Sequence, residues 1–190
     1  MQHRLDGFYF TFPLSNHEKL KNTLLTQIDE SKQIENNKPK ADDYYSESIS
    51  KLDWSWSKDF SRPWVQTLKP FLDEAISAEL TSHGYKESFI QDLWFQQYTT
   101  GDTHGWHIHG HTFTGVYYLD LPKDAPNTQI VNPTNQEEII VPDVNEGDIL
   151  MFPSYVIHRA PIIRTNENKT IISFNSTVNL ITAPVLNKLK

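Results

Sequence analysis

Four of the eight histidines in this chain lie within one window of eight residues: His104, His107, His109 and His111. An even distribution would place about 0.3 histidines in such a window, so the cluster is a strong local bias. In an extended strand, side chains two residues apart point to the same face, so His107 and His109 would present their imidazoles together. Two imidazoles at this spacing can hold a divalent metal if a third ligand arrives from elsewhere.

The candidate for the third ligand is His158, which follows a turn, a strand and a second turn over residues 147–154. In a jelly roll, a connection of this kind can return the chain to the same mouth of the sandwich. The alternative is that the histidines are surface polar residues or a fortuitous weak metal site, because a His-x-His pair alone is a weak signal.

Composition narrows the chemistry further. The chain has 190 residues and no cysteine, which excludes disulfide scaffolds, thiolate metal sites and cysteine nucleophiles, so a bound metal must use His, Asp or Glu. Its 17 basic and 24 acidic residues give a net charge of −7, which argues against nucleic acid and anionic membranes as partners. No signal-peptide pattern and no apolar run of about 18 residues is present, so we expect a soluble, cytoplasmic protein.

The N-terminal part of the chain predicts helices that support the histidine-bearing segments. Leucine and isoleucine recur at helical spacing after a Ser-x-x-Glu capping box, and a second apolar series continues to a glycine stop, with Pro70 expected to kink or restart that helix. The expected elements are a strand at 7–14, a helix of about 12 residues after 15–18, a mobile polar loop at 31–50, a short strand at 52–56 and a helical region at 61–84.

Beyond Gly84 the pattern changes to short strands separated by Gly, Pro, Asn and Asp turns, which is typical of a β-sandwich or jelly roll. We therefore predict an α+β, mainly β fold: a double-stranded β-helix (jelly roll) with N-terminal helices packed on one sheet. Residues 1–190 would form one domain, with the supporting elements in 1–84 and the metal-bearing core in 85–180. The expected strands are 89–98, 112–121, 129–132, 138–141, 148–152, 155–158 and 170–179.

Four segments of this C-terminal part resemble the 2-oxoglutarate/iron(II)-dependent oxygenases, with a subgroup from marine bacteria and phages as the nearest and the prolyl hydroxylases as more distant relatives. A phage-encoded member would act in the host cytoplasm. The segments occur in the same order as in the family and read YTTGDTHGWHIH (98–109), TGVYYL (114–119), GDILMFPSYVIHRA (147–160) and KTIISFN (169–175).

The resemblance implies a role for each matching residue. His107 and His158 fall on the two iron-binding histidines, and His109 falls where most relatives carry a carboxylate ligand. Lys169 falls on the basic residue that pairs with the far carboxylate of 2-oxoglutarate. Tyr118 and Ser173 fall on hydroxyl positions that help to hold this carboxylate, and Tyr98 falls on a residue that lines the cosubstrate pocket.

The histidine at position 109 is the departure from the family pattern, because it removes one negative charge from the metal ligands. Three interpretations stay open: an active three-histidine iron centre, a centre completed by Asp102 or Asp120, and metal binding without oxygenase activity. His104 is expected to line the pocket, and His111 to support the site or face the substrate. Trp106 is balanced between packing and substrate contact, whereas core packing is expected for Trp54, Trp56, Trp64 and Trp94.

The resemblance implies an oxygenase that uses iron(II), 2-oxoglutarate and O2, releases succinate and CO2, and hydroxylates a small molecule or a protein side chain. Two other functions compete with this one. A cupin-like three-histidine metalloenzyme would need no oxo-acid but would leave Lys169 and Ser173 without a role. A non-catalytic metal-binding module would keep only the jelly roll.

Overall fold

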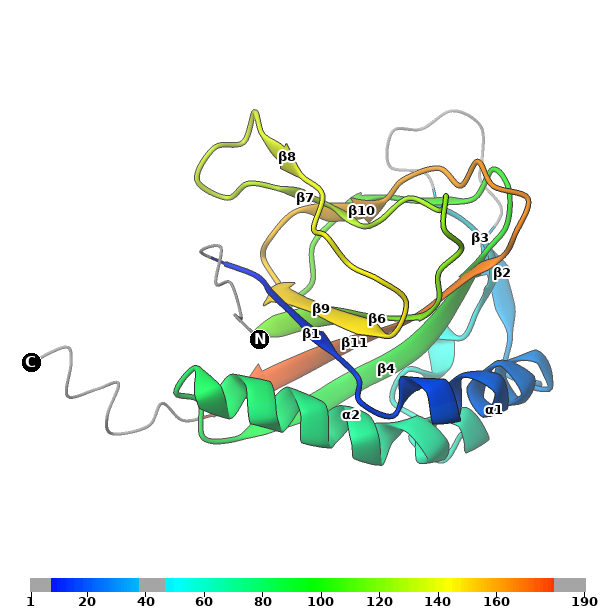
Figure 1. The fold of residues 1–190 in the computed structure, drawn as a ribbon, viewed down its shortest axis with the longest axis horizontal. Coiled ribbons are helices and arrows are strands. Elements are labelled where there is room, and N and C mark those ends of the chain that lie inside the picture. The colour runs from blue at the N-terminus through cyan, green and yellow to red at the C-terminus, as the bar shows by residue number, and fades with distance from the viewer. Residues whose placement is uncertain (1–7, 38–46, 180–190) are drawn as a thin grey trace, which may run out of the picture.

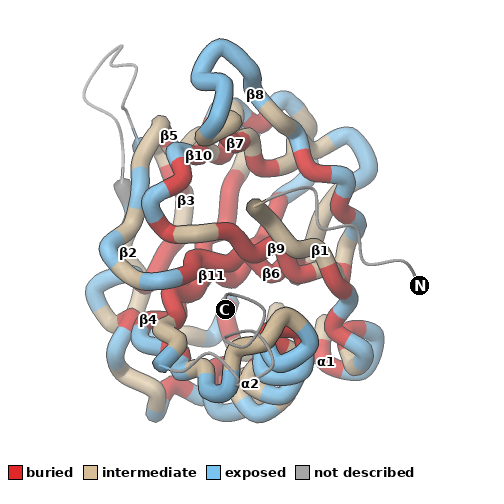
Figure 2. Tube along the Cα trace, turned by 90° about the vertical axis from the view of Figure 1, so that its left-hand side faces the viewer, coloured by how far each residue is buried: buried red, intermediate tan, exposed pale blue. Residues whose placement is uncertain are grey.

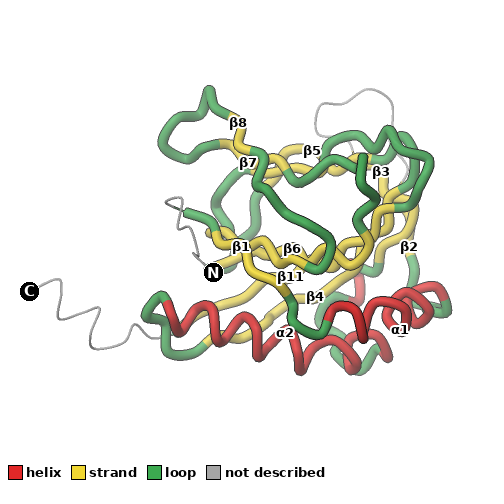
Figure 3. The backbone as a smooth tube through the Cα atoms, viewed as in Figure 1, coloured by secondary structure: helices red, strands yellow, loops and turns green. Residues whose placement is uncertain are grey.

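The computed structural model describes residues 8–37 and 47–179, which form two facing layers of strands with two helices beneath one layer (Figures 1 and 3). The first sheet has the order β1-β9-β6-β11-β4, and the second has the order β5-β10-β7-β8. The strands are β1 (Phe10–Pro13), β2 (Glu35–Asn37), β3 (Glu47–Leu52), β4 (Ser88–Tyr98), β5 (Thr103–His107), β6 (Phe113–Asp120), β7 (Gln129–Val131), β8 (Ile139–Ile140), β9 (Asp148–Pro153), β10 (His158–Ala160) and β11 (Lys169–Val178).

Strand β3 joins the two sheets, because it pairs with β4 at Lys51 and Leu52 and with β5 at Glu47 and Ser48. Within the described residues all of the sheet pairings are antiparallel, and β2 pairs only with β3. The layers, the curled sheet and the helices on one face confirm the predicted jelly roll.

The two helices are α1 (His17–Asp29) and α2 (Pro63–Ser82), and a short 3-10 helix, η1, spans Trp54–Trp56. Their apolar sides pack on the outer face of the first sheet, where Leu24 and Leu68 meet Phe95 in one buried cluster. Figure 2 shows buried segments along the strands and exposed outward turns on both helices. The expectation that N-terminal helices cover one sheet is therefore confirmed. None of the described helices is long and apolar enough to cross a membrane.

Alternation along the strands builds a second core between the sheets. On β6, Tyr117 belongs to the cluster beneath the helices, whereas its neighbour Tyr118 belongs to the cluster between the two layers. The same alternation separates Ile171 from Ile172 on β11. Because successive side chains of a strand point to opposite faces, every long strand of the first sheet contributes to both cores.

A buried ion pair between Asp53 and Arg62 lies where η1 and the start of α2 meet the first sheet. Neither side chain has any exposed surface. Asp53 also accepts hydrogen bonds from the Phe95 amide at 2.8 Å and the Trp64 indole at 3.1 Å. Arg62 in turn donates to the Leu93 carbonyl. These contacts tie η1 and the start of α2 to the middle of β4.

A second buried carboxylate ties the two sheets together. Asp102, which is 7% exposed, accepts hydrogen bonds from the Ser48 hydroxyl at 2.9 Å and the Ser50 amide at 3.0 Å. It also accepts a bond from the Thr99 amide at 2.8 Å. The carboxylate therefore links β3 to the turn between β4 and β5.

Several sequence-based expectations about local structure were wrong. Residues 52–56 are not a strand, because β3 ends at Leu52 and the chain turns into η1 with a hydrogen bond from the Trp56 amide to the Asp53 carbonyl. The expected loop at 31–50 contains β2 and the start of β3, while residues 38–46 lie outside the described part. The expected strand at 155–158 begins only at His158.

The helix ends also differ from expectation. No side chain caps the first turn of α1, whose N-cap residue is Asn16, so the predicted capping box is not formed. Pro70 lies inside α2 without ending it. Pro70 and Gln66, whose carbonyl would accept the missing amide bond, are both exposed, so water can satisfy that carbonyl.

Candidate metal centre

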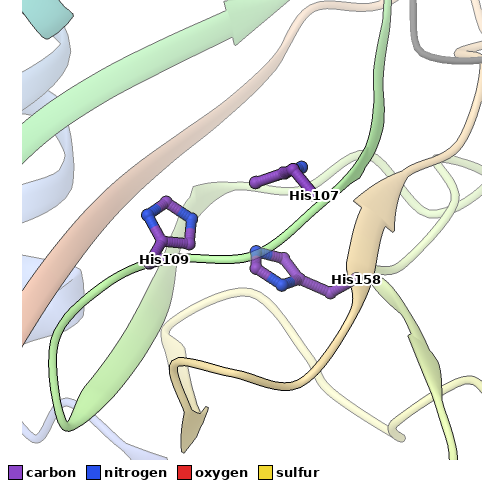
Figure 4. A group of neighbouring side chains, drawn as sticks. All are labelled: His107, His109 and His158. Carbon is purple, nitrogen blue, oxygen red and sulfur yellow. The ribbon is translucent and has the colours of Figure 1, made fainter.

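Three histidines converge at the mouth between the two sheets (Figure 4). His107 ends β5 and lies directly opposite His158, which begins β10, in an antiparallel pair. His109 follows β5, and its amide donates to the Ser154 carbonyl at 2.8 Å, which holds it beside the pair. One potential ligand atom from each of the three side chains lies within 4.8 Å of the others.

Backbone carbonyls orient two of the three rings. His107 Nδ1 lies 2.7 Å from the Gly105 carbonyl, and His158 Nδ1 lies 2.9 Å from the Val156 carbonyl. A carbonyl only accepts hydrogen bonds, so each Nδ1 carries the proton and each Nε2 offers a lone pair. Carbonyls and carboxylates that hold the second nitrogen in this way are usual beside histidine metal ligands.

Burial keeps the three rings neutral. It lowers the pKa of His107 to about 3 and that of His109 to about 4, and the neighbouring His104 acts in the same direction on both. Burial also holds the pKa of His158 well below its ordinary value. Metal binding requires deprotonated imidazole nitrogens, so this environment prepares the rings as ligands.

No carboxylate joins the three histidines within the described residues. Asp102 is engaged with β3 and the β4–β5 turn, as described above, and Asp120 pairs with Lys21 at 2.8 Å on the α1 side. The two acidic residues considered as alternative ligands are therefore committed elsewhere. The arrangement offers three imidazoles, and imidazole suits iron, zinc, copper and nickel.

The other two histidines of the cluster have different surroundings. The His104 ring stacks on the His107 ring, with a centroid separation of 3.8 Å and an interplanar angle of 13°. Its Nε2 lies 2.9 Å from a Glu47 carboxylate oxygen, and its Nδ1 lies 3.2 Å from the Gln96 amide nitrogen. His104 therefore lines the site beside the triad, as expected. His111 points away from it, toward Asp92 at 3.4 Å.

The residues expected around 2-oxoglutarate lie deeper between the sheets. Lys169 begins β11 and is paired in register with Tyr98 at the end of β4. Its ammonium group lies 5.5 Å from the Tyr118 ring and donates to the Pro126 carbonyl. Only 1% of Lys169 is exposed, and burial lowers its pKa to about 7.

The three hydroxyl groups of this region differ in whether they have a hydrogen-bond partner. The Tyr118 hydroxyl donates to Thr128 at 2.8 Å, and the Ser173 hydroxyl donates to Gln96 at 3.0 Å. The Tyr98 hydroxyl is buried with no hydrogen-bond partner in the described part of the chain. An orphaned hydroxyl and a buried ammonium fit an anionic ligand with several acceptor oxygens, because the hydroxyl would gain the acceptor that it lacks and the ammonium would gain an opposite charge in addition to a neutral carbonyl.

The cavity between the three histidines and Tyr98 is small. A hollow of about 20 Å³ runs from the triad to Tyr98, and Thr128, Arg159 and Ser173 also line it. A ligand the size of 2-oxoglutarate therefore requires side chains to move, and Lys169 would exchange the Pro126 carbonyl for the ligand. The hydrogen-bond donors fit a dianion, and the dianion can enter only when these side chains move.

Two polar residues of this site were not found from the sequence. Gln96 lies between His104 and Ser173, and Thr128 meets the Tyr118 hydroxyl. Strand parity could have indicated Gln96, because it lies on the same face of β4 as Tyr98. No pattern in the sequence marked Thr128, which precedes the three-residue strand β7.

Comparison with known proteins agrees with this geometry. Residues 92–175 match the family described as "Putative 2OG-Fe(II) oxygenase". No curated protein matches the chain.

Solved structures share the fold at low sequence identity. An oxidoreductase of the 2OG-Fe(II) oxygenase family from Burkholderia pseudomallei is 11% identical, with a TM-score of 0.69, over 93% of this chain and 88% of that one. The viral collagen prolyl hydroxylase of Paramecium bursaria Chlorella virus-1, solved with 2-oxoglutarate, is 13% identical, with a TM-score of 0.63, over 90% and 96%. A Trichoplax adhaerens prolyl hydroxylase, solved with a hypoxia-inducible-factor peptide, is 15% identical, with a TM-score of 0.62, over 90% and 84%.

Proposed function

Because residues 92–175 belong to the 2-oxoglutarate/iron(II) oxygenase family and the chain has that fold, we propose that it hydroxylates a substrate at a centre of His107, His109 and His158. The enzyme uses iron(II), 2-oxoglutarate and O2. The observation that carries the assignment of residues is the convergence of three neutral imidazoles at a hollow that runs to Tyr98, the register partner of the buried Lys169.

Bound iron and 2-oxoglutarate supply the oxidising chemistry: the oxo-acid is decarboxylated to succinate and CO2, and one oxygen atom of O2 enters a C–H bond of the substrate. The protein residues bind, orient and exclude water. His107 and His158 present Nε2 because their carbonyl partners fix the other nitrogen. His107, His109 and His158 would hold the iron, and a set of three protein ligands would leave room on the metal for the oxo-acid and O2.

Lys169 and Tyr98 hold the far end of the oxo-acid in this proposal. The ammonium group donates a charge-assisted hydrogen bond to the far carboxylate, and the Tyr98 hydroxyl donates a second bond. Tyr118 and Ser173 lie on the same face of the first sheet and complete the polar wall through Thr128 and Gln96. The buried position of this end fixes which end of the cosubstrate faces the metal.

The all-histidine ligand set changes the charge of the site. Iron(II) held by three neutral imidazoles would carry two positive charges, and protonated Lys169 adds a third, so the bound dianion would leave one net positive charge. A carboxylate in place of His109 would cancel that charge. The all-histidine set therefore gives the 2-oxoglutarate dianion one more positive charge to bind against, in a buried site where charges interact most strongly.

The test adds 2-oxoglutarate to the iron(II) protein without oxygen and looks for the metal-to-ligand charge-transfer band. We expect the band in the unmodified protein and its loss in His158→Ala. Succinate formation under air should follow the same order. Absence of the band, together with an oxo-acid affinity that Lys169→Ala does not change, would refute the proposal. Turnover with O2 but without oxo-acid would favour the cupin-like alternative.

The remaining expectations stay predictions. These are a single domain over residues 1–190, a cytoplasmic location, and the absence of nucleic-acid and membrane partners.

A further inference from the structure

A groove passes the triad and borders the small hollow described above, with which it shares Trp94, Gln96 and His104. It consists of two hollows, of about 290 and about 670 Å³, that share Trp54, Ile108 and His109. We call it the Trp54 groove. Its smaller part reaches His104 and its larger part reaches Asp92, so a molecule lying in it would pass directly by His109. Drug-sized ligands occupy pockets of about 300–1,000 Å³, so both parts together can hold a small organic molecule.

The wall of the groove beside the triad is apolar and exposed. Trp54 is 44% exposed and Ile108 is 56% exposed, although both are large hydrophobic side chains. The Trp54 and Trp94 rings meet edge to face at 4.5 Å, and Trp94 lies 5.8 Å from the His109 ring. The expected core packing of Trp54 is therefore wrong. Its exposed ring next to the triad offers an apolar ligand about 25 cal/mol for each Å² removed from water.

The far end of the groove contains a carboxylate that is nearly buried. Asp92 is 3% exposed, and Asn175 donates to its Oδ2 at 3.1 Å. His111 Nε2 is 3.4 Å from the same oxygen, longer than a strong charge-assisted bond. Within residues 8–37 and 47–179, the hydrogen-bond and ion-pair partners of Asp92 all lie at Oδ2.

A carboxylate in this position needs a cation or several donors, because a buried and poorly paired charge is costly. Asn175 gives Asp92 one neutral hydrogen bond, from its amide to Oδ2, and no charge, while its carbonyl oxygen accepts from Thr114 at 3.0 Å. Lys58 lines the same hollow as an exposed residue, and no ion pair joins it to Asp92. A cation from outside the chain would supply the partner.

We propose that the Trp54 groove binds an amine-bearing substrate. Its ammonium or guanidinium group pairs with Asp92, its apolar segment lies against Trp54 and Ile108, and the carbon between them faces His109. This inference rests on the proposed function, because it names the class of molecule that the oxygenase would hydroxylate. The reaction converts a C–H bond to C–OH while O2 and 2-oxoglutarate give succinate and CO2.

The test measures binding to the metal-free protein by isothermal titration calorimetry, so it does not depend on turnover. The probes are 4-phenylbutylamine, 4-phenylbutanol and 4-phenylbutyrate, which share one apolar segment and differ in charge. We expect the amine to bind at least about tenfold more tightly than the alcohol, which corresponds to one charged hydrogen bond. The acid should bind most weakly.

Two variants assign the contacts. Asp92→Asn keeps an acceptor for Asn175 but removes the charge, so it should lower the amine affinity about tenfold and leave the alcohol unchanged. Trp54→Ala should weaken the amine and the alcohol together. The matched control is Asp73→Asn on α2, a carboxylate that pairs with Lys69 far from the groove and should change neither affinity.

Equal affinity for the amine and the alcohol would overturn the proposal, and so would tightest binding of the acid, which would indicate that Lys58 governs the groove. If circular dichroism shows that Asp92→Asn does not fold, the three probes on the unmodified chain still decide. The oxygenase assignment is tested separately by the charge-transfer band. Amine binding without that band would refute the proposed function but leave the groove assignment standing. The band without a preference for the amine would refute the groove assignment and support the oxygenase.

Discussion

The affinity for 2-oxoglutarate should fall as the pH rises through neutrality, because its proposed cation is a lysine whose pKa is lowered to about 7 by burial. Below that pH, Lys169 is already protonated in the free protein and can pair with the dianion directly. Above it, each binding event must first protonate the amine. A bound dianion raises the pKa of Lys169, so binding and proton uptake are linked.

The magnitude follows from this linkage. If the bound lysine stays protonated throughout, the affinity falls about tenfold between about pH 6 and about pH 8, and about tenfold more for the next unit. Near pH 8, roughly 0.9 proton should be taken up for each ligand. His107 and His109 do not interfere, because their pKa values of about 3 and about 4 lie well below this range.

The assay is calorimetry of 2-oxoglutarate binding to the manganese(II)-loaded protein in two buffers with different heats of ionisation. The difference between the buffers gives the proton uptake directly. Lys169→Met should abolish both the uptake and the pH dependence, and it should lower the affinity at pH 6 by roughly 10- to 100-fold, as expected for a lost charged hydrogen bond. An affinity that is constant between pH 6 and pH 8, with no proton uptake, would refute the role of Lys169.

Three further predictions concern the ligand set and the frame that holds it. His109→Asp should keep a bound metal but weaken 2-oxoglutarate by about tenfold or more, because it places a negative charge beside the dianion; calorimetry on the metal-loaded variant checks this. Gly115→Ala should lower the free energy of unfolding by about 1–3 kcal/mol, measured by urea denaturation, because its Cβ would lie 2.1 Å from the Phe174 ring. Arg62→Met should cost about 3–5 kcal/mol in the same assay by leaving the buried Asp53 carboxylate without its positive partner, and the double variant with Asp53→Asn should cost less than the sum of both changes.

The convergence of His107, His109 and His158 was accessible to sequence reasoning, although one of the assumptions behind it was wrong. His107 and His109 were expected to meet because they alternate on one strand, yet β5 ends at His107. What brings His109 back is the hydrogen bond from its amide to the Ser154 carbonyl, on the segment that leads to His158. A contact between two loops leaves no periodic pattern, so it could not be predicted from spacing.

The substrate side was not accessible in the same way. The alternation of Leu52, Trp54 and Trp56 is typical of a half-buried strand, and the core packing expected for Trp54 followed from its residue type. The chain turns there because the Asp53 side chain is held by Phe95 and Arg62, residues that lie far along the chain from each other. Long-range pairing of this kind overrides local propensity.

The hydrogen bonds of the Asp102 carboxylate affect how stable the protein is under reducing and oxidising conditions. The carboxylate holds Ser48, Ser50 and Thr99 together at the point where the two sheets meet, a cross-linking role that disulfides have in many secreted domains. A cross-link of hydrogen bonds has no reduction potential and takes no part in thiol exchange. In a chain without cysteine, the seam between the sheets should therefore hold equally well in the presence of reductants and of the oxidants that an oxygen-consuming site can release.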